Sequence, residues 1–431
     1  MTLCKPLRKP FYEPLPEARR PAPSRYLSRL TLSLLLAGFA GGAGAEELLG
    51  REEREALDLS AYRVTDPDAG YFDVAERMAE LESTDNAILL QELDEFSRGP
   101  SCEQLLAYEP ITTRVRIPGY YPNPEEWELA SEPLFRFEDS VSMLAGAFIA
   151  SGDSYYADCL VRYLDHWAEA EALTDFHYDS TQPQAWFATE SMLFAAGMAY
   201  ATVRPFVEGL EEERERLEAW LNGLAHQHAN IPGEPENSCC NNHFYRRALY
   251  GSIIGVITED DELFRFGVSA IHSALHDMTE EGALPLEVNR GRRATHYQNY
   301  ALLYLVTNMQ VIARQGYEEI FDLEVDGNTL HDGVDFLFRI LEDPAALGDF
   351  APLEQYTGFL KDPQYFTWME IYQARFDDSR VADFVHRVRP LYNRSAGGYM
   401  TLYLMPPDAQ THIFQDDEQR QTEAFRGLGE S

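Results

Sequence analysis

The stretch from residue 239 to residue 278 reads CCNNHFYRRALYGSIIGVITEDDELFRFGVSAIHSALHDM, and it contains the unit that most of the chain repeats. Apolar residues recur at three- and four-residue intervals from Phe244 to Ile257 and again from Asp260 to Met278, which is the pattern of amphipathic or buried helices. Thr258, Glu259 and Asp260 interrupt the pattern, as residues at helix ends do. The stretch therefore predicts two helices joined by a short turn.

Helical pairs of this kind follow one another over most of the sequence. The predicted helices are 134–150 with 155–172, 185–203 with 209–229, 294–313 with 328–341, and a further pair at 365–376 with 381–388. The alternation typical of a strand is confined to Tyr399–Leu404. A long series of helical hairpins must bury its apolar faces against neighbouring hairpins. We therefore expect an all-α toroid or solenoid over residues 46–407, and no segment resembles a linker that would divide it.

The two ends of the chain differ from this pattern. Basic residues precede an apolar run at 30–40, and the small residues at 43–45 fit a cleavage site. The apolar run is too short to span a bilayer. We expect residues 1–45 to be a signal peptide, the mature protein to be periplasmic or secreted without membrane insertion, and residues 408–431 to be a flexible tail.

The sequence of 431 residues is strongly acidic, with a formal net charge of −37 and lysine only at positions 5, 9 and 361. An acidic, lysine-poor surface fits either a protein kept soluble in high salt or an ordinary acidic protein outside the cytoplasm. Both interpretations stay open. Nucleic acid is excluded as a partner, because affinity for its phosphates requires positive patches.

Four cysteines remain after the predicted signal peptide: Cys102, Cys159, Cys239 and Cys240. An even number in an oxidising compartment favours disulfides, and four cysteines allow three pairings. If the two adjacent cysteines pair, the other bridge joins Cys102 to Cys159. No CxxC pair suggests zinc, and His272 and His276 lack the glutamate of an HExxH motif. We expect no metal and no cofactor.

Two polar stretches stand out as candidates for a site. Asn241, Asn242 and His243 crowd the start of a helix where capping needs one asparagine, and we expect Asn241 to be that cap. Glu287-Val288-Asn289-Arg290-Gly291-Arg292-Arg293-Ala294-Thr295-His296-Tyr297 concentrates arginines in a chain short of positive charge, which indicates an anionic ligand. We expect both stretches to face one cleft.

These two stretches resemble the alginate lyases of polysaccharide lyase family 5. The likeness rests on CCNNHFY at 239–245 and on EGALPLEVNRGRRATHYQNYAL at 281–302. It extends more weakly over 151–173, 186–200 and 367–370, and so covers most of the mature chain.

The resemblance implies an incomplete (α/α) toroid with a deep cleft and a metal-independent eliminase. By motif position it places the catalytic residues at Asn242, His243, Arg290 and Tyr297. It also implies a vicinal disulfide between Cys239 and Cys240 and a second bridge from Cys102 to Cys159.

The substrate-binding residues that we expect are Trp186, Arg293, His296, Tyr300, Tyr120 and Tyr121. The family commonly has a lid loop bearing lysine and tyrosine, but this part of the chain has no lysine. The Pro- and Tyr-rich segment 102–133 is either such a lid, with Tyr120 and Tyr121 in place of the usual residues, or a loop over the first helices. For Trp186, packing in the core is an equally good interpretation.

The sequence thus predicts a monomeric lyase that cleaves 4-linked polyuronates, polymannuronate above all, by β-elimination. Three alternatives remain open. The chain could act on glucuronan or on mixed uronates, it could be a non-catalytic periplasmic protein that handles polysaccharide, or it could be an (α/α) glycosidase, which would leave no double bond in its product.

Overall fold

The computed structural model of the chain describes residues 48–96, 98–119, 123–179, 181, 183–233 and 239–411. The predicted signal peptide, Tyr120, Tyr121 and residues 412–431 of the predicted tail lie outside this part of the chain. From Leu48 onward the described residues belong to one compact unit.

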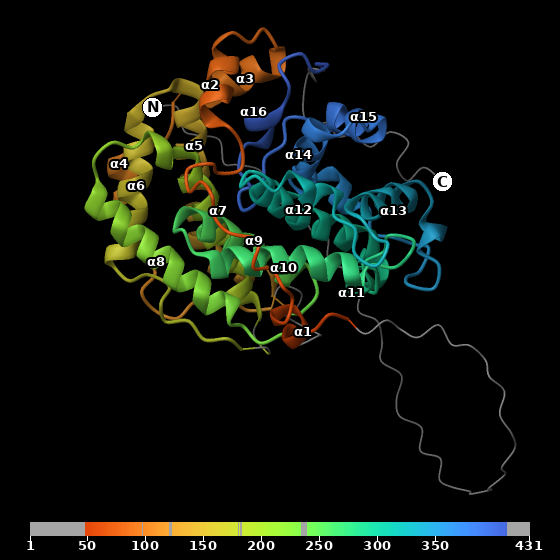
Figure 1. Ribbon diagram of the computed structural model, residues 1–431. Helices are drawn as coiled ribbons and strands as arrows, with labels where there is room; N and C mark the ends of the chain where they lie inside the picture. The colour runs from red at the N-terminus through yellow and green to blue at the C-terminus, as the bar shows by residue number, and fades with distance from the viewer. Residues whose placement is uncertain are drawn as a thin grey trace, which may run out of the picture. The chain divides into compact units, whose positions relative to one another are not determined.

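Two kinds of helix alternate along most of this unit (Figure 1). The first kind is largely buried, and its members pack side by side in chain order: α5 (Pro124–Ser151), α7 (Pro183–Val203), α9 (Asn242–Ile257), α12 (Ala294–Ala313) and α14 (Trp368–Arg375). The second kind covers the first and exposes one face: α6 (Ser154–Glu169), α8 (Glu211–Ala229), α10 (Asp261–Asp277), α13 (Leu330–Glu342) and α15 (Ser379–Val388). This arrangement of inner and outer helices confirms the predicted (α/α) toroid.

Short helices connect and flank these pairs. They are α1 (Arg51–Glu55), α2 (Val74–Glu82), α3 (Ala87–Phe96), α4 (Cys102–Leu106), α11 (Pro285–Val288) and α16 (Met400–Leu404), with 3-10 turns η1 (Arg204–Phe206), η2 (Gly291–Arg293), η3 (Glu318–Asp322), η4 (Pro344–Leu347), η5 (Gly358–Lys361) and η6 (Pro363–Phe366). The described ranges contain no β-strand, and the β-pairing found there consists of two isolated bridges.

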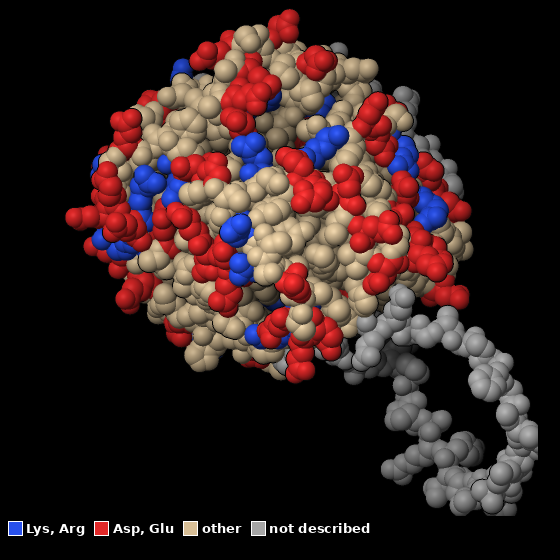
Figure 2. Space-filling view, viewed as in Figure 1, with Lys and Arg blue, Asp and Glu red and all other residues tan. Residues whose placement is uncertain are grey.

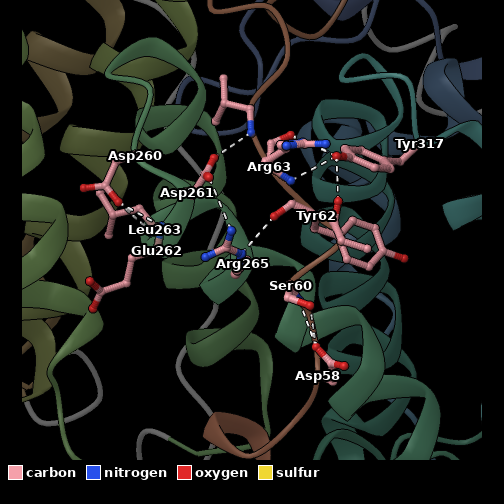
Figure 3. Close-up of polar contacts among 12 residues, drawn as sticks. Asp58, Ser60, Tyr62, Arg63, Asp260, Asp261, Glu262, Leu263, Arg265 and Tyr317 are labelled. Atoms are coloured by element: carbon pink, nitrogen blue, oxygen red, sulfur yellow. Dashed lines mark hydrogen bonds and ion pairs between the residues drawn. The ribbon is translucent and has the colours of Figure 1, made fainter.

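Helices α9 and α10 form the predicted hairpin, and glycines let them approach closely. A Cβ atom on Gly267 would clash with the Oγ of Ser252, and one on Gly255 would lie 2.6 Å from the backbone nitrogen of Phe264. Asp260 caps α10, since its Oδ1 accepts from backbone N–H groups of the first turn at 3.0 and 3.1 Å (Figure 3). Larger residues at the two glycine positions would push the helices apart.

The segment before α2 is anchored to this hairpin (Figure 3). The Nε of Arg265 donates to the carbonyl oxygen of Tyr62 at 2.8 Å, and the backbone N–H of Val64 donates to Asp261 Oδ1 at 2.8 Å. The rings of Tyr62 and Tyr317 lie 4.9 Å apart. These contacts hold the N-terminal arm of the unit on α10, so that α1 reaches the beginning of α9.

Helix α5 begins at Pro124, so the predicted start at Leu134 is wrong. Proline suits the first position of a helix because its missing N–H has no partner there in any case. Pro133 inside α5 has no N–H to donate to the carbonyl oxygen of Leu129, a residue that is 77% exposed. The predicted loop at 102–133 is therefore correct only for its middle: residues 107–119 have no helix, whereas 102–106 form α4 and 124–133 belong to α5.

The strand predicted at 399–404 is also wrong, because Met400–Leu404 forms α16. Leu402 is fully buried, and the Thr401 Oγ1 donates to Glu370 Oε1 at 2.6 Å. Periodicity in so short a run does not distinguish a strand from a buried helix. Among the described residues, α16 packs against α2, α3 and α14, and no strand is present there for it to pair with.

Both predicted disulfides are present. Cys102–Cys159 joins the beginning of α4 to α6, with the two Cα atoms 5.6 Å apart. Cys239–Cys240 links neighbouring residues whose Cα atoms are 3.8 Å apart.

Candidate active site

The vicinal disulfide lies immediately before α9. Cys240 has a left-handed backbone conformation, with φ of 62°. Arg54 of α1 packs its guanidinium 4.0 Å from the centroid of the Phe244 ring, and its Nη1 lies 3.4 Å from each sulfur atom. Asn241 then caps the helix, because its Oδ1 accepts from the backbone N–H of the second residue after it at 3.1 Å. The disulfide and Arg54 thus brace the turn that aims the first side chains of α9, and the predicted capping role of Asn241 is confirmed.

Asn242 connects the two polar stretches. Its backbone N–H donates to Glu287 Oε1 at 2.5 Å, and its Nδ2 donates to Glu287 Oε2 at 2.8 Å. Both side chains are fully buried. Burial raises the pKa of Glu287 to about 7, against the opposing effects of Arg290 and of the bonds from Asn242. Asn242 and Glu287, which are 45 positions apart, therefore bring the two polar stretches into contact.

His243 is partly buried and stacks on Phe187 of α7. The ring centroids are 3.5 Å apart and the planes differ by 4°. Burial, followed by the charges of Arg246, Arg290 and Arg247, holds the pKa of His243 well below its usual value of 6.5. His243 is therefore a neutral imidazole near pH 7, able to donate from one ring nitrogen and accept at the other.

Arg290 lies over Tyr297. Its guanidinium carbon is 4.8 Å from the ring centroid, and its Nε donates to the carbonyl oxygen of Leu286 at 3.2 Å. Both side chains are partly exposed. The Arg290 charge also acts on His243 and on Glu287, the partner of Asn242, so Arg290 lies near the beginning of α9.

The other two arginines of the stretch turn elsewhere. Arg292 pairs with the exposed Glu354 at 2.5 Å. The guanidinium of Arg293 lies 4.6 Å from the ring centroid of Tyr356. The close group of arginines seen in the sequence is thus divided, and Arg290 is the member that faces Tyr297.

The predicted substrate-binding residues occupy two places. Trp186 is 2% exposed, with its ring centroid 6.0 Å from that of His243. His296 is buried between Tyr300, at 5.8 Å between ring centroids, and Tyr365, at 4.8 Å. Burial and the charge of Arg293 lower the pKa of His296 to about 3. Trp186 thus lies beside His243, whereas His296, Tyr300 and Arg293 form a second group around the start of α12.

A group of charged residues near His243 was not among the predicted site residues. Glu190 of α7 is fully buried, and three side chains surround its carboxylate: Arg246 at 3.2 Å, Arg247 at 3.6 Å and His228 at 3.3 Å. The sequence did contain a signal for these residues, because charged side chains are unusual in helices that are otherwise apolar. No comparable pattern marked Phe187 as the ring on which His243 stacks.

Buried polar atoms that lack a hydrogen-bond partner also gather here. Among the described residues they include Trp186 Nε1, Asn242 Oδ1, His243 Nδ1, Arg246 Nε and His296 Nδ1. Such atoms are rare in folded proteins. Four of these five atoms belong to α7 and to the first two turns of α9, where water or a polar ligand can complete their hydrogen bonds.

Metal-ligating side chains do not gather in the described residues, where no group of three or more His, Cys, Asp or Glu could hold an ion. Of the histidine pair noted in the sequence, His276 Nδ1 lies 2.6 Å from Asp326 Oδ2, and burial lowers the pKa of His272.

Comparison with known proteins gives the class of this (α/α) toroid, which is a carbon–oxygen lyase of polysaccharides. A family model described as "Alginate lyase" matches residues 89–347. The chain belongs to the alginate lyase family.

Its relatives agree with this assignment. A polysaccharide lyase of Stenotrophomonas maltophilia is 30% identical over 274 residues, which cover 63% of this chain and 79% of that protein. An alginate lyase of Pseudomonas syringae pv. tomato is 26% identical over 286 residues, covering 64% and 73%.

Among solved structures, alginate lyase A1-III from Sphingomonas species A1 superposes with a TM-score of 0.73 at 29% identity, covering 82% of this chain and 100% of that one. A tyrosine-to-phenylalanine variant of that lyase, complexed with a tetrasaccharide, also gives 0.73 at 30% identity, with coverage of 82% and 100%.

Proposed function

We propose that the chain depolymerises alginate, with polymannuronate blocks preferred, by β-elimination that leaves a 4,5-unsaturated sugar at the new non-reducing end. The observation that carries the proposal is that Arg290, whose charge acts on His243, lies over Tyr297 in a member of this family. The saccharide-bound relative supports a polysaccharide ligand.

The reaction begins at C5 of a uronate, whose proton is hard to remove because the neighbouring carboxylate already carries a negative charge. Positive charge and hydrogen-bond donors at that carboxylate stabilise the developing dianion. Arg290 supplies the charge. Asn242 donates one Nδ2–H to Glu287, and its second Nδ2–H can donate to the substrate carboxylate.

Tyr297 then completes the elimination. Its phenolate oxygen takes the C5 proton, the electrons of the C5–H bond form the C4=C5 double bond, and the C4–O bond breaks. The leaving oxygen takes the proton back from the phenol, which regenerates the phenolate. In β-mannuronate both events occur on one face of the ring, so one side chain suffices, and the adjacent Arg290 stabilises the anionic oxygen.

His243 offers a second mode. As a neutral imidazole it can accept the C5 proton when that proton lies on the opposite face, as in the C5 epimer guluronate. Polyguluronate would then be a slower substrate, with different residues acting as base and acid.

The proposed site of action is the periplasm or the medium. The basic and apolar N-terminal segment and the two disulfides support export, since disulfides persist in oxidising compartments. Within the described residues, no helix has the length and apolar character needed to cross a membrane.

The test is direct. Mature protein incubated with polymannuronate, polyguluronate and glucuronan should raise ultraviolet absorbance fastest on polymannuronate, as the unsaturated product forms. No rise on any uronan, over a range of salt concentrations, would reject the eliminase. A faster rise on glucuronan would reject the substrate preference while keeping the chemistry.

A further inference from the structure

Gln298 follows Tyr297 on α12 and is fully buried. Its Oε1 accepts from the backbone N–H of Leu284 at 3.0 Å, and its Nε2 donates to the carbonyl oxygen of Gly282 at 3.0 Å. A backbone N–H can only donate and a carbonyl oxygen can only accept, so these two partners fix the orientation of the amide. One side chain thus pairs two buried backbone groups of the segment that leads into α11.

The bond to Leu284 closes a loop of the chain that ends at Gln298. Glu287, Arg290 and Tyr297 all lie within this loop. Leu284 directly precedes α11, and its carbonyl oxygen accepts from the N–H of Glu287 at 2.9 Å. Gln298 therefore holds the N-terminal end of the helix that carries Glu287.

From α11 the contacts continue to the proposed catalytic residues. Glu287 holds Asn242 by two hydrogen bonds, at 2.5 and 2.8 Å. The carbonyl oxygen of Leu286 accepts from the Nε of Arg290 at 3.2 Å, and the Arg290 guanidinium lies over the ring of Tyr297. A displacement of α11 relative to α12 would therefore change the position of Arg290 over Tyr297 and pull on the bonds that hold Asn242.

The segment 282–284 also packs against α13. Gly282 has φ of 92°, and a Cβ atom there would clash with the backbone oxygen of Asp332. Ala283 is fully buried in one apolar cluster with Phe336 of α13. Contact with α13 thus limits the movement of the segment in one direction, and the two hydrogen bonds from α12 set its distance from that helix.

We propose that Gln298 is a positioning residue of the lyase, which fixes Glu287 and Arg290 at the distance from α12 that the reaction requires. This inference rests on the proposed function. Reacting groups that are misplaced by about 1 Å can lose about a hundredfold in rate. Loss of the amide would leave two buried backbone groups of the segment 282–284 unpaired, and α11 would shift to relieve that cost.

The test compares Gln298→Met with Asn308→Leu, each of which removes a buried amide from α12 and keeps a side chain of similar size. Asn308 is the matched control, about three turns beyond Tyr297. Its Nδ2 donates to the carbonyl oxygen of Gly267 at 2.9 Å, and its Oδ1 accepts from Ser252 Oγ at 2.6 Å. We expect both variants to lower the melting temperature, but only Gln298→Met to lower kcat on polymannuronate, by at least about tenfold and with KM changed by less than about threefold.

Hydrogen exchange of backbone amides, followed by NMR, tests the inference without turnover. Rates are expressed relative to the core amides of α5 in the same protein, which cancels a general loss of stability. In Gln298→Met we expect the N–H groups of Leu284 and Asn242 to exchange at least about tenfold faster, because the first loses its acceptor and the second depends on the position of Glu287. In Asn308→Leu both relative rates should stay as in the unsubstituted chain.

Gln298→Glu keeps the inference testable should Gln298→Met not fold. Its protonated carboxyl group can make both bonds, whereas the ionised form cannot donate to Gly282. We expect kcat per folded molecule, divided by that of the unsubstituted chain at the same pH, to fall at least about tenfold between pH 6 and pH 9.5, since burial raises the pKa of a glutamic acid into this range. Ionisable groups on the neighbouring elements are present in both proteins, so the ratio removes their effect. They are Glu287 and Arg290 around α11, His296 and Tyr297 on α12, and His331 and Asp332 on α13.

An unchanged kcat in Gln298→Met would overturn the inference, and so would an equal loss of kcat in Asn308→Leu. Unchanged relative exchange at Asn242 in Gln298→Met, or a ratio in Gln298→Glu that does not depend on pH, would overturn it as well. Failure of the proposed function is a separate result, seen as no product from the unsubstituted chain, and the exchange measurement needs no product.

Discussion

Tyr297 is the residue whose removal separates chemistry from binding. We expect Tyr297→Phe to lower kcat on polymannuronate by at least about a hundredfold, because the variant loses both the base and the acid. Affinity for the polymer, measured by calorimetry, should change little, since Arg290 and Asn242 remain. Tyr317→Phe is the matched control, because Tyr317 packs on Tyr62 of the N-terminal arm, and this variant should keep full activity. Substantial turnover by Tyr297→Phe would assign the base elsewhere.

Glu287 makes the site sensitive to pH. Its pKa is raised to about 7, so acidification through pH 7 protonates it and removes one of the two acceptors that hold Asn242. We expect kcat/KM to fall as the pH drops through this range. Glu287→Gln presents an amide N–H to the Asn242 Nδ2, and should lower kcat/KM at pH 8 by about tenfold or more.

The decisive feature of the Glu287→Gln profile is its shape. The variant cannot titrate at this position, so the inflection near pH 7 should disappear from the pH dependence of kcat/KM. If the variant keeps the inflection, a group other than Glu287 causes the pH dependence.

The two disulfides should differ in their effects on the free energy of unfolding and on kcat, because they close loops of different length. Cys102–Cys159 spans 57 residues and restricts the unfolded chain. Replacing both cysteines by serine should lower the free energy of unfolding by about 4 kcal/mol, as measured by urea denaturation.

Cys239→Ser with Cys240→Ser is the natural comparison, since that bridge joins neighbours and closes almost no loop. Its loss should affect stability less but kcat more, because the turn before α9 aims Asn242 and His243. Equal losses of stability in the two double variants would contradict this division.

Helix α5 carries a buried carboxyl group that should make folding pH-dependent. Glu138 is 1% exposed, and burial raises its pKa from 4.5 to about 8. Between these two values the unfolded chain ionises while the folded chain keeps its proton, so stability falls as the pH rises from 4.5 to 8.

Glu138→Gln, which has nearly the same shape and no charge, should remove this loss. We expect it to stabilise the protein at pH 8 by on the order of 3 kcal/mol and to have little effect at pH 4. Thermal unfolding across this pH range checks the expectation. An equal change at both pH values would indicate a packing effect instead.

For the molecule as a whole, the acidic surface opposes a polyanionic substrate. Acidic side chains cover much of the face shown in Figure 2, with basic ones between them, and the formal net charge is −37. Salt shortens the range of this repulsion from about 10 Å at 0.1 M to about 3 Å at 1 M. Buried charges at the site are screened less.

We therefore expect sodium chloride to raise both the melting temperature and kcat/KM on polymannuronate between low salt and about 0.5 M. Sucrose of equal osmolarity is the control, because it does not screen charge. A kcat/KM that falls steadily from the lowest salt would show that the local field of the arginines dominates the encounter.

Local patterns predicted much of this fold. The limits of α12, Ala294–Ala313, match the predicted helix, and Asn241 caps α9 as expected. Helix periodicity and capping depend on residues within one or two turns, so they can be read from a single stretch. The start of α5 shows the limit of such patterns, because proline breaks a helix in its interior but is favoured at the first helical position, where Pro124 lies.

The family motifs located the side chains of the site, but not their surroundings. Asn242 meets Glu287 across 45 positions, and Glu190 meets Arg246 across 56. Such contacts depend on how α7, α9 and α11 pack, and no local pattern encodes them. The sequence thus specified the helices, the caps and the polar side chains, because these follow from neighbours along the chain. The burial and charge that set the protonation of His243 and Glu287 arose from packing, because desolvation and Coulomb interactions depend on distance in space.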